Sequence, residues 1–210
     1  MWPFSRKRKL SSKELAKYIA ISTVTNRVGI NLFKDHTILT KKELLFETNI
    51  LDMVIMHFVV KAYFDFNENQ YMPFLSHYTS YCHDRMVAMR IIERSFDFNT
   101  AFVTRLNEYQ EALHDDMSSK SCLVTGRKMC EYFGVPHTDI RYCFPAAQLF
   151  VKYIDATRQA FSGLMKIYKI DETSEFTFDE KHLIYDFRNL RIEAEKEAMG
   201  RRRQSRKADG

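Results

Sequence analysis

Residues that break helices are rare in this chain of 210 residues, which contains 6 glycines and 4 prolines. Long segments therefore run without a helix-ending residue, and several repeat apolar side chains at three- and four-residue steps. The pattern is clearest over 146–168, where Ala146, Phe150, Ile154 and Phe161 share one helical face. We predict an all-α fold: a single helical-bundle-like domain of about six or seven helices with basic, flexible termini.

Capping residues and breakers indicate where the predicted helices begin and end. The segment 11–14 has the form of a capping box, so the first helix is predicted to start there and to reach about Lys34. Thr40 is predicted to cap the second helix, and no segment alternates long enough to demand a strand. The later helices are predicted over 41–66, 73–95, 99–117, a short segment ending before Gly134, 145–168 and 179–199, with Pro73 and Pro145 in opening turns.

Positive charge is concentrated at the two ends of the chain. The net charge is +5, and residues 1–13 contain five cations and no acid. Residues 200–210 contain five cations and one acid, so 14–199 carries a net charge of −4. We therefore predict a basic aromatic tail over 1–10, the helical domain over 11–199 and a basic tail over 200–210.

Both tails are candidates for contact with an anion. The single tryptophan, Trp2, lies next to Phe4 and a run of four cations, a combination that favours an anionic membrane surface. The C-terminal cations lack aromatic neighbours and suit the phosphates of a nucleic acid equally well. Solvated ends that only aid solubility are the alternative. The predicted contact residues are Trp2, Phe4, Arg6, Lys7, Arg8, Lys9, Arg201, Arg202, Arg203, Arg206 and Lys207.

Two short motifs match parts of known metal sites. His83 begins the His-Asp dipeptide of the HD metal-dependent phosphohydrolases, and Glu111 with His114 matches the Glu-x-x-His element of di-iron helical bundles. On a helical wheel, however, His83 faces away from the apolar side and towards Arg94, while Glu111 lies on a charged stripe. His182 falls on a polar side in the same way. We therefore predict no metal site and no cofactor.

Asp52 is predicted to face the core, because it falls among Leu45, Met56 and Val59 on the second helix. A buried carboxylate is costly unless it is paired or hydrogen-bonded. We favour a structural carboxylate that meets a hydroxyl, an arginine or a backbone amide. The alternative is a metal ligand or general base in a helical hydrolase or oxidoreductase, which requires a histidine to meet it. Another sector of this helix gathers Glu43, Glu47, His57 and Lys61.

The internal stretch 126–144 interleaves cations with aromatic rings around Gly134 and Pro136. Cations and stacking rings together can hold a phosphate and a base, although the P-loop pattern is absent. The alternative is a short helix and loop whose rings pack and whose cations are solvated. The candidate ligand-binding residues are Arg127, Lys128, Arg141 and Tyr142.

The four cysteines form no Cys-x-x-Cys pair and no secretory signal is convincing, which favours reduced thiols in the cytoplasm. The apolar stretch 44–66 is interrupted by charges and is predicted to be a buried core helix rather than a membrane span. We expect a non-enzymatic cytoplasmic interaction protein whose tails meet an anionic membrane surface or an acidic protein partner. Nucleic-acid association and an enzyme centred on Asp52 are the alternatives. The oligomeric state is not predicted.

Overall fold

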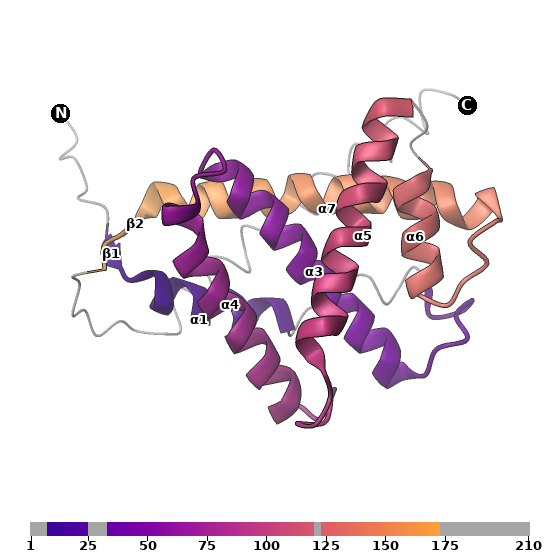
Figure 1. Cartoon of the computed structure of the whole chain (residues 1–210), viewed down its shortest axis with the longest axis horizontal. Helices are drawn as coiled ribbons and strands as arrows, with labels where there is room; N and C mark the ends of the chain where they lie inside the picture. Colours follow the sequence, from indigo (N-terminus) through magenta and orange to yellow (C-terminus); the bar gives the residue numbers. More distant parts are fainter. Residues whose placement is uncertain (1–7, 25–32, 120–122, 173–210) are drawn as a thin grey trace, which may run out of the picture.

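The computed structural model describes residues 8–24, 33–119 and 123–172. Within them, six helices pack around a hydrophobic core, so the fold is all-α as predicted (Figure 1). Two short strands accompany the helices. The elements are β1 (Arg8–Leu10), α1 (Ser12–Val24), α3 (Lys41–Tyr63), α4 (Glu68–Ala88), α5 (Phe98–Ser119), α6 (Val124–Tyr132), α7 (Ile140–Ile167) and β2 (Tyr168–Ile170).

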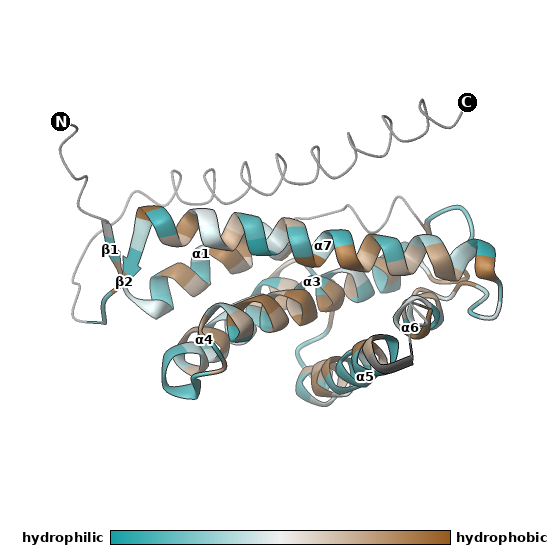
Figure 2. Cartoon of the chain, turned by 90° about the horizontal axis from the view of Figure 1, so that it is seen from above, coloured by the Kyte–Doolittle hydropathy of each residue, from teal (hydrophilic) through white to brown (hydrophobic). Residues whose placement is uncertain are grey.

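Helix α3 is the central element of the fold. It contacts α1, α4, α5 and α7, and it lies between α7 on one side and α4 and α5 on the other (Figure 2). Every residue from 47 to 57 is buried, which confirms the predicted core helix. A helix that is apolar nearly all round must be covered by neighbours on most of its faces. Helices α1, α4, α5 and α7 supply this cover, and α6 packs on α5 and α7.

Local capping explains several helix ends. At the start of α1, the Ser11 hydroxyl accepts from the Glu14 backbone N–H and the Glu14 carboxylate accepts from Ser11 N–H, which confirms the predicted capping box. Thr40 and Glu43 form the same box at α3. The chain leaves α6 through Gly134, whose φ of +61° is the left-handed conformation that glycine adopts without strain.

The predicted roles of the two internal prolines were wrong. Pro73 lies inside α4, which starts at Glu68, and Pro145 lies inside α7, which starts after the cap residue Asp139. Each proline follows its helix start by five residues, where its missing N–H removes one hydrogen bond. Burial of the apolar face of each helix outweighs that loss. The polar run predicted to separate two helices, 67–70, instead supplies the cap and first turn of α4.

The pairing of β1 with β2 was not predicted. The two strands run parallel, Arg8 opposite Tyr168, and the backbone N–H of Asp171 donates to the Leu10 carbonyl at 2.8 Å. Leu10, at the end of the segment predicted as the N-terminal tail, is fully buried. Three-residue strands carry too little alternation to be recognised in a sequence. Residues 25–32, in the second half of the first predicted helix, and 179–199, the whole of the last, lie outside the described residues.

Candidate functional site

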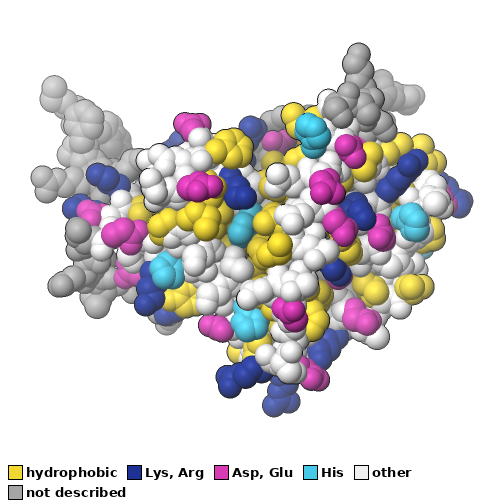
Figure 3. Space-filling view, in the orientation of Figure 1, with side chains coloured by type: hydrophobic (Ala, Val, Ile, Leu, Met, Phe, Trp, Pro, Cys, Tyr) yellow, Lys and Arg dark blue, Asp and Glu magenta, His cyan; other side chains and the backbone are white. Residues whose placement is uncertain are grey.

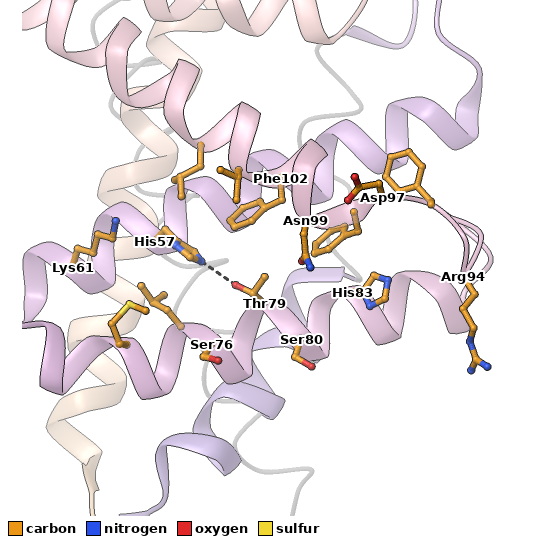
Figure 4. A pocket seen from close by; sticks show the side chains of 16 residues that line it. His57, Lys61, Ser76, Thr79, Ser80, His83, Arg94, Asp97, Asn99 and Phe102 are labelled. Carbon is orange, nitrogen blue, oxygen red and sulfur yellow. Dashed lines mark hydrogen bonds between the residues drawn. The ribbon is translucent and has the colours of Figure 1, made fainter.

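Helices α4 and α5 meet at the loop between them and diverge from it, forming a V with α3 behind (Figure 1). The space between them is a pocket of about 710 Å³. Figure 4 shows His57 and Lys61 of α3 at one end of this pocket, with Thr79 of α4 and Phe102 of α5 facing one another across it. The pocket exists because α4 and α5 both pack on α3 without closing on each other.

A second pocket of about 670 Å³ lies at the C-terminal end of α3, between α5, α7 and the turn into α4. Lys61 lines both pockets, so the two pockets are neighbours that share its side chain. We call the two pockets together the α3 groove. Its floor and walls include His57, Lys61, Tyr63, Phe66, Met72, Leu75, Thr79, Phe96, Phe102, Val103, Leu113 and Ile154.

Large apolar side chains remain open to solvent along the α3 groove. Tyr63, Phe66, Met72, Phe96 and Val103 all line it and are each between 40% and 69% exposed. Figure 3 shows hydrophobic side chains on this face of the molecule, interspersed with histidines, cations and acids. Several exposed large apolar side chains around one hollow are typical of a site that binds another molecule.

The turn at the end of α3 holds Phe66 in a strained conformation. Asp65 and Phe66 have φ angles of 48° and 59°, the left-handed region that bulky residues avoid. The N–H of Phe66 donates to the Lys61 carbonyl at 2.9 Å, which closes the end of α3. A non-glycine residue in this region costs about 1–2 kcal/mol. Phe66 is also 69% exposed at the groove, so a bulky apolar residue is both strained and open to solvent there.

His57 was not singled out as a site residue by its sequence context, yet it lies on the groove floor. Its ring packs edge-on against Phe102 at 5.0 Å, and its Nε2 lies 3.1 Å from the Thr79 hydroxyl. Burial, with a smaller contribution from the Lys61 charge, lowers the pKa of His57 to about 3. His57 is therefore neutral near pH 7 and is too weak a base to activate the Thr79 hydroxyl as a nucleophile.

The four candidate ligand-binding residues of the 126–144 stretch do not gather around the α3 groove. The Lys128 ammonium pairs with Glu108 at 3.0 Å and Glu131 at 2.8 Å. Arg141 pairs with Asp139 beside it, and the Tyr142 ring lies 5.2 Å from that of His36. Arg127 is exposed on α6. Binding of a phosphate by these residues stays a prediction.

A partly buried ion pair joins α3 to α5 and was missed in the sequence. The Arg105 guanidinium donates to the Glu47 carboxylate at 2.8 Å and stacks 4.2 Å from the centre of the Tyr132 ring. Burial raises the pKa of Glu47, and the hydrogen bond from Arg105 opposes that rise. The Tyr132 hydroxyl donates to Glu108, which extends the network to α6. No local motif predicts this pair, because its members are 58 residues apart.

Asp52 is buried, as its place on the helical wheel predicted. Its negative charge contributes to the raised pKa values of Tyr78 and Cys82, both of which are raised chiefly by burial. Asp52 lines neither pocket of the α3 groove. Its side chain thus faces the α3–α4 core rather than the open hollow.

The motifs that resemble metal sites are separated in the fold. Glu111 and His114 are exposed on α5, as predicted. His83 lines the groove, where its ring lies 4.9 Å from Phe98, and Arg94 lines the same pocket. Among the described residues, no three His, Cys, Asp or Glu side chains converge in a way that could hold a metal ion. His182 lies outside them.

Most of the predicted anion-contact residues also lie outside the described part of the chain, including Trp2, Phe4 and the cations of 201–207. Lys9 is described: its ammonium pairs with Asp171 at 2.7 Å, and its side chain is still 61% exposed. No described helix is long and apolar enough to cross a membrane. Comparison with protein-family models, with curated proteins and with solved structures found no match to this chain.

Proposed function

We propose that this protein is a non-enzymatic interaction protein that binds a segment of a partner protein in the α3 groove. The proposal rests chiefly on one observation: the strained Phe66 ring is held open at the rim of an apolar groove. Aromatic and methionine side chains are enriched in protein interfaces, and Tyr63, Met72 and Phe96 accompany Phe66 along the hollow. When a partner covers these side chains, their apolar surface is removed from water, which favours binding.

Two features of the groove favour binding over catalysis. The imidazole of His57 has a pKa of about 3 and stays neutral, so it offers little basicity. Asp97, the one acid among the residues that line the α3 groove, accepts a hydrogen bond from the Thr100 N–H at 3.1 Å and serves as a cap for α5. Neither group is placed as one member of an acid–base pair.

Site-specific photo-crosslinking tests this proposal. A photo-reactive residue at Val103, which lines the groove, is compared with the same residue at Met117, which is exposed on the same helix outside it. We expect a defined adduct from position 103 alone, and its partner segment, identified by mass spectrometry, should bind the purified protein. Phe66→Asn should abolish that binding without lowering stability, because asparagine tolerates the left-handed conformation. Equal adducts at both positions would contradict the proposal.

We further propose that the basic tails hold the protein in the cytoplasm at the inner face of an anionic membrane. The sequence supports this second function through Trp2 and Phe4 beside four cations, and three buried, free cysteines fit a reducing compartment. A nucleic acid is the competing anion. Nucleic-acid binding through the C-terminal tail should weaken steeply with salt, each phosphate contact adding about 0.7–0.9 to the log–log slope, and a version ending at Met199 should lose it.

A further inference from the structure

Cations outnumber acids along the α3 groove. Lys61 and Arg94 line the larger pocket with one acid, Asp97, and Lys61 and Arg158 line the smaller pocket with none. Arg158 is occupied by an ion pair with Asp155 at 3.1 Å. The groove therefore presents a positive charge to whatever enters it.

Lys61 is the cation at the junction of the two pockets. Its ammonium lies 5.9 Å from the centre of the Tyr71 ring, and it makes no ion pair with any residue that the structure describes. Its neighbour His57 is neutral, so it neither adds to this positive charge nor offsets it. An apolar occupant that covered Lys61 would strip water from an unpaired ammonium, which is costly. An occupant with a carboxylate at that position avoids the cost.

We propose that the α3 groove takes an acidic amphipathic helix, with apolar side chains in its two pockets and a carboxylate on Lys61. This inference rests on the proposed groove-binding function. The walls are the helices α3, α4, α5 and α7, so the groove offers no strand edge for an extended peptide to pair with. A helix satisfies its own backbone and can place side chains three, four and seven residues apart into successive pockets.

Three synthetic helices of about five turns test the inference. They share one apolar face and differ only in the residues that flank it, which are glutamate, glutamine or lysine. Calorimetric titration of the full-length protein should give the glutamate peptide an affinity about tenfold or more above that of the glutamine peptide. Lys61→Glu should reverse the order and favour the lysine peptide. Lys166→Glu, an equal charge change at an exposed position of α7 outside the groove, should keep the original order.

The variants separate the groove from the basic tails, which also attract acidic peptides. If Lys61→Glu leaves the affinity of the glutamate peptide unchanged, the tails capture the peptide and the inference is wrong. If all three peptides bind equally and Val103→Glu removes the binding, the groove function stands and the acidic preference fails. Lys61-dependent binding of an oligonucleotide or of anionic vesicles, with no peptide bound, would also overturn the inference.

Discussion

Acid is expected to destabilise this protein through His57. In the folded protein the pKa of His57 is about 3, compared with 6.5 for a histidine in solvent. Because the folded-state pKa is the lower one, the unfolded chain takes up a proton first as the pH falls. The stability linked to His57 is complete above the unfolded pKa and is lost progressively between pH values of about 6.5 and 3. At about pH 4.5 the loss is about 2.7 kcal/mol, since each pH unit contributes about 1.4 kcal/mol.

Such a loss is a large part of the 5–15 kcal/mol typical of a folded domain, so it is measurable. Urea unfolding at about pH 7.5 and 4.5 gives the loss for the natural protein, for His57→Gln and for His114→Gln. Glutamine removes the titration but can still bond to the Thr79 hydroxyl. We expect His57→Gln to lose about 2.5 kcal/mol less than the natural protein, and the exposed His114→Gln to behave like the natural protein. If all three proteins lost the same unfolding free energy between the two pH values, His57 would not be buried in its neutral form.

Three further predictions concern other parts of the chain. Gly126→Ala should lower the unfolding free energy by ~2 kcal/mol or more, because its methyl group would overlap the Cys143 carbonyl oxygen where α6 meets α7; an unchanged urea midpoint would contradict this contact. Asp52→Leu should lower the unfolding free energy by ~1–3 kcal/mol, because the polar group that interacts with the buried carboxylate would lose its partner. A higher urea midpoint for this variant would contradict a structural role. Anionic vesicles should shift Trp2 fluorescence to the blue more than neutral vesicles do, and removal of the Trp2 and Phe4 rings should weaken binding; a Trp2 already blue-shifted without lipid would argue against the anchor.

The sequence predicted those features that depend on near neighbours in the chain. The capping box at Ser11, the Thr40 cap and the glycine after α6 act over three or four residues, so they are recognisable without a structure. The burial of Asp52 follows from the same helical periodicity. Proline misled the prediction at 73 and 145, because a single missing hydrogen bond is outweighed when the rest of the helical face is buried.

The groove and the partly buried ion pair could not be predicted in this way. The Glu47–Arg105 pair and the His57–Thr79 contact depend on how α3 crosses its neighbours, and helical spacing within one segment carries no information on that crossing. The exposure of Phe66 likewise follows from two left-handed residues after α3. An Asp-Phe-Asn sequence gives only a weak signal for that turn. The sequence shows which residue types are present, but only the packed helices show which of these residues lie close together.

The pairing of β1 with β2 has a consequence for synthesis of the chain. The nearby bond from the Ser12 N–H to the Glu172 carboxylate spans 160 residues, so the N-terminal strand emerges from the ribosome long before its partner. At 5–20 residues per second, that delay is roughly 8–30 s. Through this interval the apolar side chain of Leu10 lacks the cover that it has in the finished protein. Residues 8–10 are therefore made long before the strand that pairs with them, and the two-stranded sheet can form only after α7 and β2 have been made.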